Sequence, residues 1–291
     1  MKKHAFCALA LSFALMIGVS NPAEACTSAV ISGKVTPDGR PLLWKNRDTD
    51  NVQNAVKYFS GEKYAFIGIV NSVDNPTEIW IGTNTAGFAI MNTQSYNLVE
   101  VQPGEERGEA NGRVMKRALE VCGSIEDFKV FLDTLSKPSG IEANFGVIDA
   151  QGGAAMFEVG YYDYVMFDAN DPKDAPMGYI ARTNFSFSGG LYEGMGYVRY
   201  MNEDVELMRA AGTGQITPAW IFSDLARCFK NQMMGIDLKD GAYHTPRTTG
   251  WFVDKDFIPR RSTGSSVVVQ GVKKGENPDL TVMWTALNYP P

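Results

Sequence analysis

The N-terminal stretch MKKHAFCALALSFALMIGVSNPAEAC constrains this chain more than any other segment. Two lysines precede an apolar run at positions 5–19, and an A-x-A pattern then ends at Ala25. A secretory signal peptide typically has a positively charged start, then an apolar run too short to span a membrane, and small residues just before its cleavage site. We therefore expect residues 1–25 to be removed and Cys26 to become the first residue. The expected location is periplasmic or secreted.

Two other interpretations of Cys26 compete with this one. A lipoprotein cysteine carries lipid, but its signal usually has a Leu shortly before the cysteine and only small uncharged residues between. Here Ala23 stands at the Leu position and Glu24 is charged, so a lipid anchor fits less well. A buried N-terminal helix would show polar residues at helical spacing, and the apolar run has none.

Residues 26–291 are long enough for a single domain with a sizeable core, and no linker, repeat or low-complexity tract divides them. The whole chain carries a formal net charge of −6 and has no basic cluster. This argues against nucleic acid or an anionic membrane as a partner. A second apolar span is absent from the sequence, so we expect no integral membrane segment. The sequence does not determine the oligomeric state, and a homo-oligomer is one of the options it leaves open.

Three cysteines remain after the cut: Cys26, Cys122 and Cys228. In an oxidising compartment an odd count implies one free thiol. Cys122 and Cys228 fit either a disulfide or two buried thiols, because pairing cannot be read from sequence. The only histidine after the cut is His244, so a histidine-based zinc site is nearly excluded and a Cys–His pair would depend on that one residue. We expect no metal and no cofactor.

The order of apolar patterns predicts the layers of the fold. Residues 26–48, with turn residues at 37–39, predict a β-hairpin. Further strands are expected in seven segments: 64–71, 77–84, 87–93, within 143–160, within 161–171, 265–272 and 280–287. Helices are expected in four segments: 105–121, 124–136, around 194–211, and 217–230. This order favours an α+β fold with a four-layer αββα sandwich, in which helices cover two facing, mostly antiparallel sheets.

The segment CTSAVISGKVTPDGRPLLWKNRD at 26–48 resembles the N-terminal hairpin of the N-terminal-nucleophile (Ntn) cysteine hydrolases. The most similar groups are the choloylglycine hydrolases, the acyl-CoA:6-aminopenicillanic acid acyltransferase-like hydrolases and the acid ceramidases. In these proteins the mature chain begins with Cys, and a following strand ends in G-R-N-x-D. The resemblance implies the Ntn-hydrolase fold for residues 26–291, with Cys26 as nucleophile.

Two registers relate this chain to the G-R-N-x-D motif. In the preferred register Asn46 and Asp48 match, and Lys45 takes the place of the family's Arg. In the other register Arg47 and Asp50 have the Arg-x-x-Asp spacing, but the Asn is lost. The supporting cation is therefore Lys45 or Arg47.

Three more matches follow in family order. GTNTAGFAIMNTQSYN places Asn92 at a position that lines the oxyanion hole of bile salt hydrolases. YIARTNFSFSG places Asn184 at a second active-site Asn, although the family's Pro is missing. GYVRYM makes Arg199 a weaker match to a family arginine, and a solvated helix residue paired with Glu203 or Asp204 is the competing interpretation. The two asparagines could equally be residues that flank turns.

The resemblance also implies a division of roles among these residues. The α-amine of Cys26 takes the thiol proton, since a free thiol is only slightly ionised at neutral pH. Asp48 orients that amine, Asn92 stabilises the oxyanion and Asn184 positions the amine or the substrate. A nearby cation lowers the thiol pKa.

The expected activity is hydrolysis of linear, non-peptide C–N bonds in small N-acyl amides by an exported enzyme. An Ntn-type dipeptidase is the closest alternative, and a non-catalytic, lipid-anchored binding protein is an alternative from another class. The Gly- and aromatic-rich segment 185–197 fits either a substrate-lining loop or an exposed linker.

Overall fold

The computed structural model describes residues 25–100, 108, 110–244 and 252–291. The predicted signal peptide, apart from Ala25, lies outside these residues, as does part of the helix expected at 105–121. In the ranges that the structure describes, no helix is both long and apolar enough to cross a membrane.

The predicted hairpin is present and forms the centre of a five-stranded sheet. Strands β1 (Thr27–Ile31) and β2 (Leu42–Asp48) pair antiparallel. The sheet has the order β10-β1-β2-β13-β14, with β10 at Tyr179–Arg182, β13 at Thr263–Gln270 and β14 at Val282–Leu287. The two hairpin strands are therefore flanked by segments from much later in the chain.

The second sheet is a seven-stranded antiparallel meander whose spatial order follows the sequence. Its strands are β3 (Asn54–Phe59), β4 (Phe66–Asn71), β5 (Ile81–Asn84), β6 (Ala89–Gln94), β7 (Ala143–Ile148), β8 (Ala154–Val159) and β9 (Tyr164–Asp168). A small third sheet pairs β11 (Lys230–Asn231) with β12 (Ile236–Asp237).

The two large sheets face each other closely at Gly146 on β7. A Cβ atom at this position would lie 2.7 Å from Val30 and 2.9 Å from Leu43 of the five-stranded sheet, and 2.3 Å from Met91 of its own sheet. Any larger residue here would therefore have to displace the side chains of Met91, Val30 and Leu43. Val30 and Leu43 belong to the same hydrophobic cluster as the inner face of the seven-stranded sheet.

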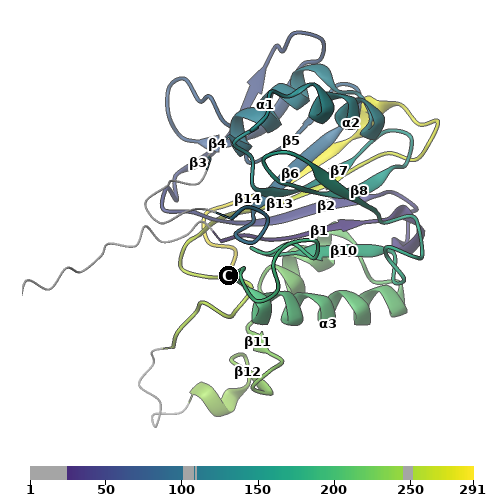
Figure 1. Cartoon of the computed structure of the whole chain (residues 1–291). Helices are drawn as coiled ribbons and strands as arrows, with labels where there is room; N and C mark the ends of the chain where they lie inside the picture. The colour runs from purple at the N-terminus through teal and green to yellow at the C-terminus, as the bar shows by residue number, and fades with distance from the viewer. Residues whose placement is uncertain (1–24, 101–107, 109, 245–251) are drawn as a thin grey trace, which may run out of the picture.

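Helices cover both outer faces (Figure 1). Helices α1 (Asn111–Val121) and α2 (Ile125–Thr134) pack on the seven-stranded sheet, where the ring of Phe128 contacts Phe145 and Phe157 edge-on. Helix α3 (Tyr197–Thr213) packs through Leu207 and Ala210 on the other face of the hairpin. The predicted α+β, four-layer αββα sandwich is confirmed.

The helix expected at 217–230 is wrong at its C-terminal end. Helix α4 (Pro218–Trp220) continues as a π-helical turn at Ile221–Leu225 and then stops. The carbonyl of Ala226 accepts a hydrogen bond from Asn46 Nδ2 at 3.1 Å, and Lys230 pairs with β12. In a longer helix the carbonyl of Ala226 would accept a backbone N–H from the next turn. Here it accepts from Asn46 instead, which lies on β2 and is far away in sequence. Strands β3 and β10 were not expected from the sequence.

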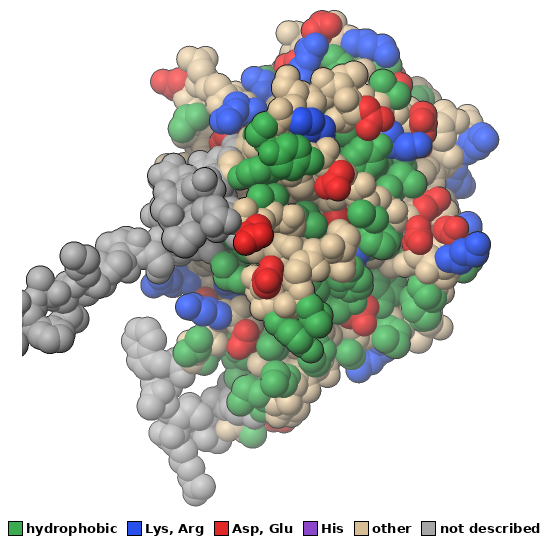
Figure 2. All heavy atoms as spheres, in the orientation of Figure 1, with side chains coloured by type: hydrophobic (Ala, Val, Ile, Leu, Met, Phe, Trp, Pro, Cys, Tyr) green, Lys and Arg blue, Asp and Glu red, His purple; other side chains and the backbone are tan. Residues whose placement is uncertain are grey.

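On the face shown in Figure 2, acidic and basic side chains are interspersed rather than separated into blocks. This face therefore offers no extended positive field to a polyanion.

Candidate active site around Cys26

Cys26 lies directly before β1 and is 4% exposed. The pairing of Thr27 with Asn46 sets it beside the end of β2, and its Sγ lies 4.0 Å from the backbone oxygen of Asp48. The position of Cys26 next to Asp48 is thus a direct result of the hairpin register.

Arg199 ties Cys26 to Asn184. Its Nη1 donates to the carbonyl oxygen of Cys26 at 2.7 Å and to Thr27 Oγ1 at 3.0 Å. Its Nη2 donates to Asn184 Oδ1 at 2.7 Å. Asn184 Nδ2 in turn donates to the carbonyl of Gln94, which ends β6. One guanidinium thus links the start of β1 to α3 and, through Asn184, to the second sheet.

The alternative interpretation of Arg199 as a solvated helix residue is wrong, because the side chain is buried. Burial, and secondly the positive charge of Arg260, lower its pKa to about 10. Gly196 makes room for it: with φ at 84°, a Cβ there would lie 2.4 Å from Nη2 of Arg199. The start of α3 is therefore shaped around this guanidinium.

Asp48 is buried and held by two side chains. Arg260 Nε donates to its Oδ2 at 2.8 Å, and Thr263 Oγ1 donates to its Oδ1 at 2.5 Å. Arg260 Nη2 also donates to the carbonyl of Ala25 at 3.2 Å, so this arginine connects Asp48 to the residue before Cys26. Burial raises the pKa of Asp48 above its ordinary value, and the charges of Arg260 and Arg199 oppose this rise.

Arg260 was not identified from the sequence. The only local signal is the pair of arginines in IPRRST just before a predicted strand. Its position beside Asp48 follows from the pairing of Thr263 with Asp48 across β13 and β2, and pairing over such a sequence separation leaves no local pattern. Asp50, the acidic residue of the other motif register, is exposed.

The two candidate cations have different partners. Lys45 Nζ donates to Asn92 Oδ1 at 2.8 Å and to the carbonyl of Trp80 at 3.0 Å. Arg47 Nη1 donates to Asn54 Oδ1 at 3.0 Å, and its guanidinium stacks 4.5 Å from the centre of the Trp80 ring. Lys45 therefore holds the amide oxygen of Asn92, which leaves the Nδ2 group of Asn92 as the donor end.

The segment that follows Asn184 is anchored at its start and exposed at its tip. Asn97 Nδ2 donates to the carbonyls of Ser186 and Gly190, each at 2.9 Å. The buried Glu158 accepts from the backbone N–H of Phe187 and is paired with Arg182 at 2.6 Å. In the tip, Leu191 and Tyr192 are 77% and 83% exposed. The hydrogen bonds with Asn97 and Glu158 fix the chain just after Asn184, so the start of segment 185–197 is not a free linker.

Glu203 is a second residue that was not identified from the sequence. It lies one helical turn after Arg199, is fully buried, and neither oxygen has a hydrogen-bond partner within the described residues. Burial, and secondly the charge of Asp204, raise its pKa well above the ordinary value. Burial therefore favours the neutral carboxylic acid at this position.

The other two thiols are free and buried, so the pairing of Cys122 with Cys228 does not occur in this structure. Burial raises the pKa of Cys122 to about 12 and also raises the pKa of Cys228. Both are structural rather than reactive thiols. Within the described residues, no three His, Cys, Asp or Glu side chains gather as a metal site would require.

No protein-family description matches this chain, and no curated protein matches it. Solved structures do. An N-acylethanolamine-hydrolyzing acid amidase ortholog from Caenorhabditis elegans superposes with a TM-score of 0.55 at 13% identity, covering 90% of this chain and 100% of that one. At this identity the likeness establishes the fold.

Two more distant structures have TM-scores below 0.5. A mutant conjugated bile acid hydrolase from Clostridium perfringens gives 0.46 at 15% identity, covering 91% of this chain and 97% of that one. Penicillin V acylase from Agrobacterium tumefaciens gives 0.43 at 12% identity, covering 90% and 82%. The predicted resemblance is confirmed at the level of the fold by the superposition on the acid amidase ortholog, an Ntn hydrolase.

The burial of Glu203 makes the free energy of unfolding of the parent protein depend on pH in a way that a Glu203→Gln variant would not share. A raised folded-state pKa means that the folded protein holds the proton more tightly than the unfolded chain, whose Glu pKa is about 4.3. The stabilisation is complete below that value and is lost as pH rises towards the folded pKa. We expect Glu203→Gln to be more stable than the parent at pH 8 by about 1 kcal/mol or more, because each unit of pKa difference between the folded and unfolded states is worth about 1.4 kcal/mol, and equal to it at pH 4.

Thermal melts and urea titrations at both pH values measure this difference. Glu206→Gln on the same helix is the matched control, because Glu206 pairs with Arg209 and Lys230 and its replacement should give no gain. A Glu203→Gln protein less stable than the parent at pH 8 would show that Glu203 is instead an ionised partner of Arg199.

Proposed function

We propose that this chain, which has the Ntn-hydrolase fold, is an amide hydrolase in which Cys26 is both the nucleophile and, after removal of residues 1–25, the N-terminal residue. The main support is that Arg199 and Arg260 donate to the backbone carbonyls of Cys26 and Ala25, and that the same two arginines hold Asn184 and Asp48. Residues 26–291 would form a single exported domain in the periplasm or outside the cell.

The first step needs a base for the thiol. A free thiol has a pKa of about 8.5, and an α-amine has a pKa of about 7.7–8.0, so proton transfer between them costs little. The Asp48 carboxylate lies beside this end of β1 and would stabilise the protonated amine. Arg199 adds positive charge near the thiolate that forms.

The thiolate then attacks the amide carbonyl and an oxyanion develops. Asn92 Nδ2 would donate to it, and a donor of this kind is worth about 2.7–4 kcal/mol in the transition state. Lys45 holds the amide oxygen of Asn92, so the donor end is fixed before the substrate arrives. The protonated amine gives its proton to the leaving nitrogen, and water releases the acyl group from sulfur.

The substrate class that we favour is a linear N-acyl amide of a small molecule. The fold likeness to an acid amidase that hydrolyses N-acylethanolamines supports this choice over a dipeptide. A lipid-anchored binding protein would carry diacylglycerol on Cys26, which intact-mass measurement of the exported protein detects directly.

The nucleophile is tested by alanine substitutions at the three cysteines. Cys26→Ala should lower kcat/KM on the order of 10³-fold or more, because no covalent intermediate can form. Cys122→Ala and Cys228→Ala should stay active in proportion to their folded fraction, since both thiols are buried and protonated. Turnover is measured on N-acylethanolamines, N-acyl amino acids and dipeptides, with a thermal melt for each variant. If another cysteine variant were folded and equally inactive, Cys26 would lose its role; turnover of dipeptides alone would favour the dipeptidase.

The need for a free amine is tested by one extra residue. A chain that starts at Cys26 is compared with one that retains only Ala25 before it, both verified by intact mass. In the longer chain the nitrogen of Cys26 is an amide and accepts no proton, so activity should fall on the order of 10²-fold or more. Equal turnover from molecules that still carry Ala25 would rule out the α-amine as base.

The link between Lys45 and Asn92 predicts coupled effects. Asn92→Ala should lower kcat about 10²–10³-fold with little change in KM, as the loss of an oxyanion donor does. Lys45→Met should lower kcat about 10-fold or more, because the amide of Asn92 is no longer held, and Lys45→Arg should restore part of the loss. In a double-mutant cycle the two changes should be less than additive. A loss confined to KM would assign Asn92 to substrate binding, and full additivity would show that Lys45 does not act through Asn92.

A further inference from the structure

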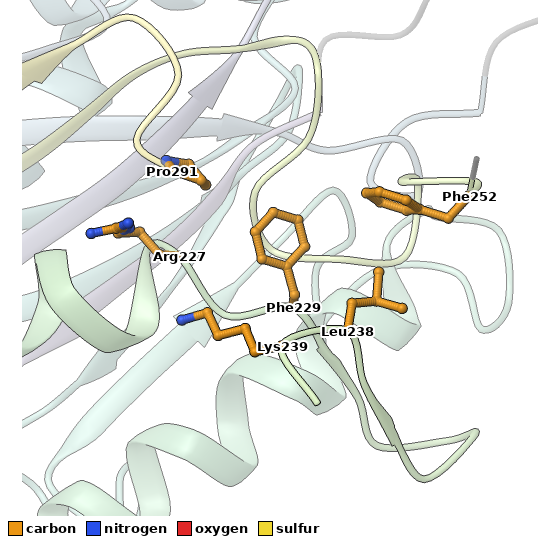
Figure 3. A pocket seen from close by; sticks show the side chains of 6 residues that line it. All are labelled: Arg227, Phe229, Leu238, Lys239, Phe252 and Pro291. Atoms are coloured by element: carbon orange, nitrogen blue, oxygen red, sulfur yellow. The ribbon is translucent and has the colours of Figure 1, made fainter. Parts of the chain in front are cut away.

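A pocket of about 330 Å³ lies beside the small β11–β12 sheet, outside the hydrogen-bond network around Cys26. Its lining comes from four parts of the chain: Arg227 and Phe229 before β11, Leu238 and Lys239 after β12, Phe252, and Pro291 (Figure 3). This volume is at the lower end of the range for small-molecule sites.

One half of the pocket is aromatic. Phe229 and Phe252 meet edge to face with ring centres 6.1 Å apart. Both also contact Phe257, at 6.1 Å and 5.6 Å, and Phe257 is 4% exposed and belongs to the core. Phe252, in contrast, is 53% exposed. A buried ring thus supports a large apolar surface that remains open to solvent, which is typical of a binding site rather than of a folding core.

The other half of the pocket is cationic. In Figure 3 the side chains of Arg227 and Lys239 extend towards the same side, away from the ring of Phe252. Within the described ranges, neither makes an ion pair with a carboxylate. The two acidic residues near Lys239 accept hydrogen bonds from backbone N–H groups. Asp237 Oδ1 accepts from the N–H of Lys239 at 2.9 Å, and Asp240 Oδ1 accepts from that of Ala242 at 3.0 Å.

We propose that this pocket binds a small amphipathic carboxylate. The apolar group lies against Phe229 and Phe252, and the carboxylate lies between Arg227 and Lys239, where charge-assisted hydrogen bonds can form. A neutral ligand of the same shape gains only the aromatic contact. The pocket favours an amphipathic carboxylate because it holds an aromatic half and a cationic half side by side.

The pocket is connected to the candidate active site. Arg227 follows Ala226, whose carbonyl accepts from Asn46 on β2, and the segment that carries Phe252 and Phe257 continues to Arg260, the partner of Asp48. Hydrolysis of an N-acyl amide releases an amphipathic carboxylate. The proposed ligand therefore has the same chemistry as the acid product of the reaction. This match rests on the proposed function, whereas the binding of a carboxylate to the pocket does not.

Binding is measured by calorimetry and by NMR titration on the full mature chain carrying Cys26→Ala, so that no turnover occurs. The probes are 4-phenylbutyrate and its neutral counterpart 4-phenylbutyramide. We expect the carboxylate to bind at least about 10-fold more tightly than the amide and to weaken with added salt. Arg227→Gln and Lys239→Gln should each remove most of that preference, and Phe252→Ala should weaken both ligands.

Lys255→Gln is the matched control, because Lys255 is exposed on the segment after Phe252 but does not line the pocket. Its affinity for both probes should be unchanged. Equal affinities for carboxylate and amide, or equal losses in Arg227→Gln and Lys255→Gln, would overturn the proposal. Because Cys26→Ala protein is used throughout, a failure of binding is distinguished from a failure of the hydrolase mechanism.

Discussion

Four charged side chains, Lys45, Arg47, Asp48 and Arg199, are buried at one end of the sandwich, each about 1% exposed. Removing a charge from water costs several kcal/mol unless partners replace the lost solvation. The partners come from several elements: β6 supplies Asn92, the segment after β10 supplies Asn184, and the segment before β13 supplies Arg260. The arrangement of these elements is therefore coupled to the stability of the buried charges.

The charges at this end are unequal in sign. Arg199 and Arg260 lie close to the single carboxylate of Asp48, while burial favours the neutral form of Glu203. An excess of positive charge favours a thiolate and an oxyanion over their neutral precursors. Burial, and secondly the charge of the nearby Arg260, lower the pKa of Arg199, because both disfavour its charged form.

The sandwich divides the candidate machinery between its layers. The five-stranded sheet carries Cys26 and Asp48, and the seven-stranded sheet carries Asn92. The two sheets pack closely at Gly146, and the side chain of Lys45 on β2 reaches across to Asn92 on β6. Helix α3 contributes Arg199 from the outside of the five-stranded sheet. No single layer holds enough of these groups to bind and polarise an amide.

Much of this arrangement is legible in the sequence because it depends on local chemistry. Alternation around the turn at 37–39 predicts the hairpin, and helical spacing predicts α1, α2 and α3. The motif at Asn46 and Asp48 points to the buried carboxylate rather than to Asp50, which the structure shows exposed. Strands β3 and β10 were missed because their sequences lack a clear alternating pattern and they gain stability only through their neighbours.

By itself, the sequence determined the layer order, the hairpin and the identity of most residues around Cys26, because periodicity, turn residues and short motifs act over a few positions. Only the tertiary structure decided which cation meets which partner, that Arg260 holds Asp48, that Glu203 is buried beside Arg199, and that Cys122 and Cys228 stay apart. These contacts join residues from distant parts of the chain or from a helix face whose burial depends on the sheet beneath it. Their register is set by packing between layers, which no local pattern encodes.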